Sequence, residues 1–500
     1  MKTDAMKPSD VSFTQRGPGS IRWRLLTLGA ALLGVISSGP TVRAEVFQVD
    51  SAQAIASAMA QAQPGDTLVM KEGNWENQRI DFVGHGTDER PITLESATPG
   101  KVVLTGSSML RISGSHLVAK GLYFLDGTLE ESEHVVQFRG PLGNATNCRL
   151  TQSAIEAYHP EDPEGRFFYV SIYGQDNRVD HNHFSKHKES GVTVVAWLDD
   201  APARHRIDAN RFTDRPKGEG NGFETIRIGT SQTSGTDAQV LVERNLFERV
   251  DGEIELISNK SNGNIYRHNI IRDCAGTITL RHGNRCVVDG NLILGKGKKH
   301  SGGVRVIGQQ HQIINNYIED IDDRAGGAIS LSASVPDSPS SGYARVADVL
   351  IAHNTLIDID GPALKLDAGY GSKGRSELPT NVTIAGNLIV HAEGGLVKGS
   401  EGDDFRWEDN LIFPLVDGFD REVGSNADPQ LNRSPSGLLI PSSQGPASKS
   451  VQTLWTDHDR LERPRHLPAD AGSETLDQGN DSVPLLAVTA EIGPGWQEQD

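Results

Sequence analysis

The stretch Asp251–Arg281, DGEIELISNKSNGNIYRHNIIRDCAGTITLR, combines alternating apolar residues with two glutamates, a lysine and an arginine. In its GEIEL segment, Glu253 and Glu255 are separated by one residue, so on a β-strand both side chains point to the same side. The isoleucine between them and the leucine after them point to the other side. The stretch therefore predicts strands that bury one face and carry charged side chains on the opposite face.

The same alternation returns in Thr277–Arg281 (TITLR) and in Gly303–Ile307 (GVRVI). Arg281 and Arg305 are 24 residues apart. If each recurrence is one coil of a repeating structure, side chains on the same side stack from one coil to the next. We therefore expect these two arginines to be stacked neighbours.

A recurring asparagine, followed one or two residues later by an apolar side chain, extends this period along the chain. It occurs at Asn182, Asn210, Asn245, Asn269, Asn291, Asn316, Asn354, Asn387 and Asn410, with spacings of 28, 35, 24, 22, 25, 38, 33 and 23. The shortest spacings correspond to one coil and the longer ones to a coil with a loop insertion. An asparagine at a tight bend tolerates unusual dihedral angles, and its amide can bond to its neighbours in a ladder.

A period near 24 with β-branched residues and many glycines predicts an all-β fold, a right-handed single-stranded parallel β-helix. Leucine-rich repeats are the alternative, but the regular leucine spacing that they need is absent. The alanine-rich segment Ser51–Ala62 predicts a helix that caps the open end of the first coil, followed by a strand over Thr67–Met70. The Ser/Pro-rich segment Ser332–Tyr343 is expected to be a loop off one coil.

The two ends of the chain differ from the repeat. Residues 1–44 are typical of an export signal, because Arg22 and Arg24 precede the apolar run Leu25–Ile36 and a small-residue cleavage site ends at Ala44. The apolar run is too short to span a bilayer, which needs about 20 residues. We expect residues 45–500 to form one β-helix domain, in which residues 415–500 are an irregular cover, and the protein to be periplasmic or secreted.

Charge is unevenly distributed in this chain. The formal net charge of −18 argues against a nucleic-acid binder. Between Lys260 and His311, however, only Asp273 and Asp289 oppose nine basic residues: Lys260, Arg267, Arg272, Arg281, Arg285, Lys296, Lys298, Lys299 and Arg305. The segment that carries the glutamate pair is therefore also a basic strip.

The cysteine content excludes a disulfide framework. There are three cysteines, Cys148, Cys274 and Cys286. One bridge, between Cys274 and Cys286, is possible, but burial as small apolar side chains is the preferred interpretation.

The glutamate pair has three possible roles: a solvated acidic edge, a glycosidase acid/base pair, or oxygen ligands for a cation. Glycosidase carboxyl groups flank one bond at about 5 to 9 Å, whereas Glu253 and Glu255 emerge side by side without a gap for a sugar. Calcium prefers oxygen ligands, and the preceding GNGFETIRIGTS segment offers more of them from Asn221 and Glu224. The spacing alone leaves the metal site and the solvated edge equally open.

Lys260 and Arg281 extend the chemistry beyond metal binding. A lysine beside positive charges loses its proton more readily and can then serve as a general base. A cation together with an arginine can neutralise a carboxylate and so acidify the proton on the adjacent carbon. These are the requirements of β-elimination from a uronic acid, in which the C5 proton is removed and the C4 glycosidic oxygen is expelled.

The motifs NGFETIRIGTS, GEIELISNKS, GTITLRHGN and GGVRVIG, in this order, resemble polysaccharide lyase family 6, which contains alginate lyases and chondroitinase B. PGDTLVMKEGNW near the start and HRIDANRF before the site extend the resemblance over most of the chain after residue 44. The resemblance implies a parallel β-helix, Ca²⁺ as cofactor and an anionic uronate polysaccharide as substrate.

By motif position, the resemblance assigns a role to each of eight residues. The calcium ligands are Asn221, Glu253 and Glu255, with Glu224 as a further candidate; the base is Lys260, the proposed acid is Arg281, and the substrate contacts are His282 and Arg305. An arginine is a poor proton donor, so Arg281 is expected chiefly to stabilise developing charge.

Several functional alternatives remain at the level of the sequence. Alginate is the expected substrate, and dermatan or chondroitin sulfate is the alternative, for which Lys296, Lys298 and Lys299 could bind sulfate. A pectinase-like hydrolase would need aspartate pairs on adjacent coils. A non-catalytic glycan-binding β-helix would not need a base beside a metal, so Lys260 is the residue that discriminates between these classes.

Overall fold

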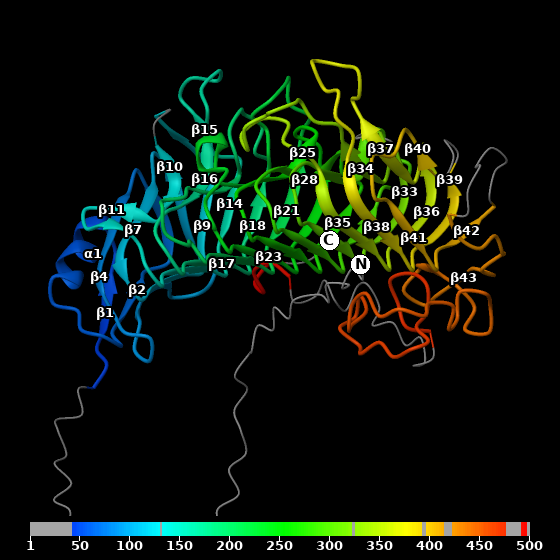
Figure 1. Cartoon of the computed structure of the whole chain (residues 1–500). Helices are drawn as coiled ribbons and strands as arrows, with labels where there is room; N and C mark the ends of the chain where they lie inside the picture. The colour runs from blue at the N-terminus through cyan, green and yellow to red at the C-terminus, as the bar shows by residue number, and fades with distance from the viewer. Residues whose placement is uncertain are drawn as a thin grey trace, which may run out of the picture. The chain divides into compact units, whose positions relative to one another are not determined.

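Three parallel β-sheets wind along the chain, and successive strands of each sheet belong to successive coils (Figure 1). The computed structural model describes residues 43–130, 133–322, 326–392, 397–414, 423–476 and 492–497. By its contacts the chain divides into Met1–Arg43 and Ala44–Asp500, and the second unit is the one considered below. The predicted signal peptide thus lies almost wholly outside the described residues.

Sheet 1 has 14 strands. They are β1 (Val46–Val49), β2 (Thr67–Met70), β5 (Ile92–Ser96), β8 (Leu117–Lys120), β13 (Arg149–Thr151), β17 (Arg178–Asp180), β20 (Arg206–Asp208), β23 (Leu241–Glu243), β26 (Ile265–Arg267), β29 (Val287–Asp289), β32 (Gln312–Ile314), β35 (Ala347–Ala352), β38 (Thr380–Ala385) and β41 (Arg406–Glu408).

Sheet 2 has 12 strands and carries the candidate site. They are β4 (Arg79–His85), β7 (Met109–Ser115), β10 (His134–Gln137), β16 (Phe168–Ile172), β19 (Val194–Ala196), β22 (Ile226–Ile228), β25 (Glu255–Lys260), β28 (Gly276–His282), β31 (Ser301–Val306), β34 (Ile329–Ser332), β37 (Leu364–Ala368) and β40 (Val397–Lys398).

Sheet 3 follows the same order of coils. Its strands are β3 (Gly73–Glu76), β6 (Val102–Gly106), β9 (Leu122–Leu129), β14 (Ala154–Glu156), β18 (His183–Ser185), β21 (Arg211–Arg215), β24 (Leu246–Val250), β27 (Ile270–Arg272), β30 (Leu292–Leu294), β33 (Tyr317–Asp322), β36 (Thr355–Asp360), β39 (Leu388–Ala392) and β42 (Leu411–Phe413), with β15 (His159–Pro160) beside β9. Neighbouring strands within the three sheets pair in parallel, which confirms the predicted parallel β-helix.

The asparagine ladder predicted from the repeat is present. The side-chain carbonyl of Asn269 accepts hydrogen bonds from the backbone N–H (3.1 Å) and the side-chain amide (3.0 Å) of Asn245, and the amide of Asn269 donates to Asn291 at 3.0 Å. This pattern runs from Asn182 to Asn410. Each ladder asparagine is almost fully buried, so the ladder satisfies polar groups that water cannot reach.

The backbone strain at these bends lies one residue earlier than expected. The residue before each ladder asparagine has a positive φ, for example 53° at His268 and 54° at Arg244. The asparagine itself is not in the left-handed region. Its role is to turn its amide into the stack, because the hydrogen bonds require the side chain and not an unusual backbone.

A helix covers the N-terminal end of the stack. The predicted capping helix is α1 (Ala52–Met59), whose N-cap Ser51 accepts a hydrogen bond from the backbone of Ala54 at 3.2 Å. Its buried Ile55 joins the core against β4 and β1, so the helix shields the edge of the first coil. The strand predicted after it is β2, with the bounds expected from the sequence.

The C-terminal segment beyond β42 is largely irregular in residues 423–476, apart from the short antiparallel pair β43 (Asn432–Arg433) and β44 (Leu439–Ile440). Its Leu438, Val451 and Ala469 pack on outward-facing apolar residues of sheet 3 in a cluster separate from the main core. The segment therefore buries apolar surface that the coils leave on their outer side.

The remaining expectations concern the loop and the cysteines. Residues 333–346 connect β34 to β35 as the predicted loop. All three cysteines are free and buried, so Cys274 and Cys286 do not pair. Burial raises the pKa of the Cys274 thiol to about 12.

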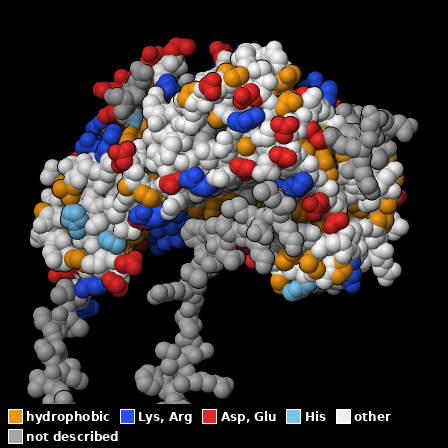
Figure 2. Space-filling model, viewed as in Figure 1, with side chains coloured by type: hydrophobic (Ala, Val, Ile, Leu, Met, Phe, Trp, Pro, Cys, Tyr) orange, Lys and Arg blue, Asp and Glu red, His pale blue; other side chains and the backbone are white. Residues whose placement is uncertain are grey.

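The surface carries charges of both signs, since acidic and basic side chains both occur across the face shown in Figure 2. No helix among the described residues is long and apolar enough to cross a membrane.

Candidate active site on the outer face of sheet 2

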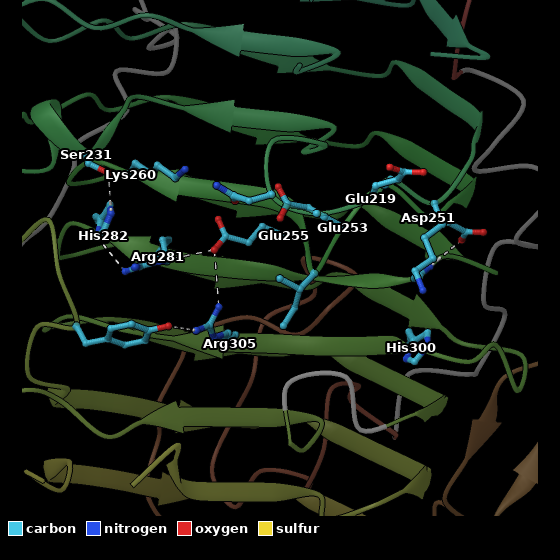
Figure 3. A pocket seen from close by; sticks show the side chains of 18 of the residues that line it. Glu219, Ser231, Asp251, Glu253, Glu255, Lys260, Arg281, His282, His300 and Arg305 are labelled. Atoms are coloured by element: carbon cyan, nitrogen blue, oxygen red, sulfur yellow. Dashed lines mark hydrogen bonds and ion pairs between the residues drawn. The ribbon is translucent and has the colours of Figure 1, made fainter. Parts of the chain in front are cut away.

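A cleft of about 1020 Å³ lies over the middle strands of sheet 2. Seven of the eight residues singled out in the sequence line it: Asn221, Glu253, Glu255, Lys260, Arg281, His282 and Arg305. The eighth, Glu224, is buried and contacts the cleft through Lys260. Figure 3 shows Lys260, Arg281 and Arg305 on successive strands with Glu255 between them.

Strands β25, β28 and β31 position these side chains. Ile257 pairs with Ile278, which pairs with Val304, and this row of buried apolar residues fixes the coils against the core. In the neighbouring row, Ser258 and Thr279 are fully buried, and Arg305 lines the cleft.

The expectation that both glutamates lie on one strand is wrong for Glu253. Strand β25 begins at Glu255, and Glu253 lies in the connection before it. A register shift between Glu255 and Ile257 shows that the backbone is irregular at this point. Both carboxylates nevertheless reach the same cleft, because the irregular backbone turns Glu253 toward it.

The expectation that Arg281 and Arg305 stack directly is also wrong. Arg305 pairs with Thr279, and a further register shift after Asn259 sets Lys260 opposite His282. The register between β28 and β31 also shifts between Gly276 and Ile278, and Arg305 lies opposite a residue two positions before Arg281, so the two arginines do not stack. They converge on Glu255 instead, each with a nitrogen 3.7 Å from its Oε1.

Glu253 is held by the backbone of the segment that precedes β22. Its Oε1 accepts hydrogen bonds from the N–H groups of Gly222 at 3.0 Å and Phe223 at 3.2 Å. Burial, together with the negative charges of Glu224 and Glu255, raises the pKa of Glu253 to about 7. Burial and the neighbouring carboxylates therefore disfavour the charged form of Glu253.

The carboxylate of Glu224 interacts with two cationic side chains. Its Oε1 lies 3.2 Å from Lys260 Nζ and 3.8 Å from Arg227. Burial acts to raise the pKa of Glu224, but Lys260 and Arg227 outweigh it, so that the pKa lies below its usual value. Its second oxygen, Oε2, is buried and has no hydrogen-bond partner among the described residues.

The prediction of a calcium site can be compared with the arrangement of these carboxylates. No group of three or more histidine, cysteine, aspartate and glutamate side chains is gathered around one point within the described residues. Glu224, Glu253 and Glu255 are therefore not gathered around one point, and the expected set relies on the amide of Asn221 as well. The repulsion between the carboxylates and the unbonded Oε2 of Glu224 are compatible with a hard cation such as Ca²⁺, which prefers oxygen ligands.

His282 is a neutral side chain in this cleft. Burial, with Arg281 and Lys260 nearby, lowers its pKa to about 4. Its Nδ1 lies 3.3 Å from an Arg281 nitrogen, which donates to it, and its Nε2 lies 3.2 Å from Ser231 Oγ. The contact with Arg281 fixes the tautomer with the proton on Nε2.

Comparison with known proteins identifies the family of this chain. A family model described as chondroitinase B matches residues 49–413. The chain belongs to polysaccharide lyase family 6. The structure of AlyGC, an alginate lyase of this family, is 33% identical with a TM-score of 0.79, over 91% of this chain and 59% of AlyGC. This chain thus spans somewhat over half the length of that relative.

Other family 6 structures match over more of their own length. A mannuronic acid specific family 6 lyase from human gut microbiota is 28% identical with a TM-score of 0.64, over 74% of this chain and 86% of that one. The family 6 lyase Pedsa3628 from Pseudopedobacter saltans is 28% identical with a TM-score of 0.67, over 73% and 92%. None of the curated proteins matches the chain significantly.

The sequence did not identify Tyr343 as a residue of this family 6 cleft. Its ring lies 4.6 Å from the guanidinium of Arg281 and 4.7 Å from that of Arg375, and its hydroxyl accepts a hydrogen bond from Arg305 at 3.2 Å. Burial acts to raise the pKa of Tyr343, but the arginines outweigh it and the pKa is lowered. The backbone carbonyl of Gly342 also accepts a hydrogen bond from Arg281 at 2.8 Å, so the loop after β34 fixes Arg281.

Arg227 is a second residue that sequence reasoning missed. It stands in the same NGFETIRIGTS segment as Asn221 and Glu224, so its position in that motif was an available signal. It lies on β22, one strand before β25, and its guanidinium is 5.2 Å from the ring centre of Trp197. Burial lowers the pKa of Arg227.

Proposed function

We propose that this protein is a lyase that cleaves a uronate-containing polysaccharide, with alginate as the substrate, by β-elimination. The observation that carries the proposal is the convergence of Lys260, Arg281 and Arg305 with buried carboxylates in one cleft. Such an arrangement combines a candidate base with fixed positive charge, which is what removal of a proton next to a carboxylate requires.

Asn221, Glu253, Glu255 and Glu224 are the residues that would hold Ca²⁺, which when bound supplies positive charge to neutralise the C6 carboxylate of the substrate. Lys260 removes the C5 proton after passing its own proton to solvent. The C4–O bond then breaks as the C4–C5 double bond forms, and the departing oxygen takes a proton from water or from Lys260.

The arginines bind and orient the uronate. Arg281 is held by Gly342, Glu255 and the ring of Tyr343, so its planar guanidinium is fixed where charge develops. Although burial lowers the pKa of Arg281, the nearby Glu255 favours its charged form. It therefore serves to stabilise charge and not to donate a proton. Neutral His282 offers an Nε2 proton to a substrate oxygen.

We favour alginate over sulfated polymers because one of the lysines predicted to bind sulfate already forms ion pairs within the protein. Lys298 Nζ is 2.9 Å from Asp251 and 3.6 Å from Asp273, so its charge is already compensated. AlyGC, the 33% identical relative, is an alginate lyase. A dermatan or chondroitin sulfate lyase is the second candidate, because the matching family model is that of chondroitinase B.

The test mixes purified protein with alginate or dermatan sulfate and follows the ultraviolet absorbance of the unsaturated uronate product, with and without a chelator. We expect absorbance to rise on alginate, to fall with chelator and to return on adding Ca²⁺. Absence of a rise on both polymers would refute the lyase, and cleavage without absorbance would indicate a hydrolase.

A substitution tests the role of Lys260 as the base. Lys260→Ala is expected to reduce turnover by about 10²- to 10⁴-fold, the range for loss of a general base. Lys296→Ala, on an exposed lysine outside the cleft lining, is the matched control and should keep full turnover. Equal activity of the two variants would exclude Lys260 as the base.

Export forms part of the proposal. The basic residues, apolar run and small-residue site within residues 1–44 support an exported protein whose mature chain starts near Glu45. Mass spectrometry of the protein from periplasmic or secreted fractions tests this, and an intact N-terminus in those fractions would contradict it.

A further inference from the structure

The oxygen that leaves C4 in a β-elimination needs a proton, and Tyr343 is placed to supply one. This tyrosine lines the same cleft as Lys260 and is partly exposed there. A phenolic hydroxyl both accepts and donates hydrogen bonds. Its ordinary pKa of about 10 lies well below that of a guanidinium, which is above about 12, so a tyrosine gives up its proton more readily than the arginines beside it.

The proton of the Tyr343 hydroxyl is not used inside the protein. Arg305 donates a hydrogen bond to Tyr343 Oη at 3.2 Å. Because a guanidinium has no acceptor, the phenolic oxygen is the acceptor in this bond and keeps its own O–H free. None of the described residues accepts a hydrogen bond from that O–H. The proton is therefore available to a substrate oxygen in the cleft.

The ring of Tyr343 is held in one position. Its centre lies 4.6 Å from the guanidinium carbon of Arg281 and 4.7 Å from that of Arg375. The backbone carbonyl of Tyr343 accepts a hydrogen bond from the N–H of Val335 at 3.1 Å, which closes the loop on itself. The carbonyl of Gly342 binds Arg281 at 2.8 Å. A hydroxyl fixed in this way meets the geometric requirement of a proton donor.

Three arginines from three different elements face this side chain. Arg281 belongs to β28, Arg305 to β31, and Arg375 to the loop after β37. Burial acts to raise the pKa of Tyr343, but these arginines outweigh it and lower the pKa. The same positive charges stabilise the phenolate that remains once the proton has been given away.

Lys260 and the Tyr343 hydroxyl lie on opposite sides of Arg281. Figure 3 shows Lys260, Arg281 and Arg305 on the successive strands β25, β28 and β31. The Tyr343 hydroxyl is bonded to Arg305, the last of the three. A sugar unit whose carboxylate is bound at Arg281 therefore has the base on one side and the phenol on the other.

We propose that Tyr343 is the general acid of the elimination and passes its phenolic proton to the oxygen that leaves C4. This rests on the proposed function. Lys260 takes the C5 proton, the electron pair of that C–H bond forms the C4–C5 double bond, and the electrons of the C4–O bond go to the departing oxygen, which takes the proton of Tyr343. The phenolate then regains a proton from water or from Lys260, so that their proton reaches the leaving oxygen through Tyr343.

The test compares Tyr343→Phe with the unchanged protein on two substrates. One is an oligouronate, whose leaving oxygen needs a proton. The other is an oligouronate with a nitrophenoxy group at C4 of its terminal unit, which leaves as a stable anion without a proton. On the first substrate we expect kcat to fall by about 10²- to 10⁴-fold with little change in KM, the range for loss of a general acid. On the second, both proteins should release nitrophenolate at nearly the same rate.

This pair of substrates separates proton donation from a structural role, because phenylalanine keeps the ring between Arg281 and Arg375 and removes only the hydroxyl. Full turnover of the oligouronate by Tyr343→Phe overturns the proposal. An equal loss on both substrates also overturns it, since the hydroxyl then only positions the arginines. Nitrophenolate release by the variant shows in addition that its cleft is folded.

The pH dependence gives a second readout. The kcat/KM of the unchanged protein on the oligouronate should fall at alkaline pH as Tyr343 loses its proton, below the ordinary tyrosine value of about 10. This fall should be absent from Tyr343→Phe. An alkaline fall of the same size in both proteins contradicts the assignment.

Tyr370→Phe is the matched control. Tyr370 is 51% exposed and lies outside the cleft lining, in the loop that also carries Arg375. Removing its hydroxyl should leave turnover of both substrates and the pH profile unchanged, and a loss like that of Tyr343→Phe would contradict a specific role of Tyr343.

The outcomes also distinguish this proposal from the lyase function itself. Unsaturated product formed at equal rates by the unchanged protein and Tyr343→Phe refutes the acid and leaves the lyase standing. Absence of unsaturated product from the unchanged protein on every uronate polymer refutes both.

Discussion

His458 should act as a pH-dependent clamp between the C-terminal segment and the coils. Its Nε2 lies 2.8 Å from Asp289 Oδ2, at the end of β29, and its Nδ1 lies 2.8 Å from Asp457. The hydrogen bond to Asp289 is the main cause that raises the pKa of His458 to about 9. A charged imidazole thus joins two segments that are 169 residues apart in the sequence.

The contribution of charged His458 to the free energy of unfolding follows from the change in its pKa on folding. The pKa rises from 6.5 to about 9, which is about 2.5 units, and at about 1.4 kcal/mol per unit this gives roughly 3 kcal/mol. His458 is 32% exposed and Asp457 is 90% exposed, so solvent screening reduces the figure to roughly 2 kcal/mol. Because the folded-state pKa is the higher one, the contribution is complete below pH 6.5 and is lost as the pH rises through 9.

The assay is the free energy of unfolding of the unchanged protein and of His458→Gln between pH 6 and pH 10. The variant should be less stable by roughly 2 kcal/mol at pH 6, and the difference should shrink toward pH 10. His391→Gln is the control, since His391 and Asp358 pair at the surface at 3.3 Å with about half of each side chain exposed. A stability difference that stays constant from pH 6 to pH 10 would refute the clamp.

Three further outcomes are expected. Asn245→Leu should lower the free energy of unfolding by about 2 to 6 kcal/mol in chemical denaturation, because two buried donors of Asn210 lose their acceptor at about 1–3 kcal/mol each; a loss below 1 kcal/mol would contradict the ladder. Arg281→Lys should lower turnover while leaving the unfolding temperature unchanged, and near-normal turnover would show that the planar guanidinium is not needed. The three buried cysteines should resist a thiol reagent in the folded protein and all react after denaturation; rapid labelling of the folded protein would contradict their burial.

The fold was predictable because each coil repeats the same local structure. A buried apolar row, a ladder asparagine and a bend recur with a period that can be counted in the sequence, and neighbouring coils satisfy one another's hydrogen bonds. The same periodicity placed Lys260 and Arg305 on one outward face. It did not locate the register shifts near Glu255 and Asn259, because a single extra residue in a strand leaves no clear mark in the pattern of apolar residues.

The sequence by itself determined the stacking of coils, which depends on spacing along the chain, and its motifs identified seven of the residues that line the cleft. Only the tertiary structure decided which partners those residues have. Tyr343 is 62 positions from Arg281, and it reaches the arginines because a loop folds back over sheet 2. The rings of Trp197 and Tyr173 likewise meet only because separate coils stack. Such contacts arise from the path of loops and the register between coils, which local periodicity does not encode.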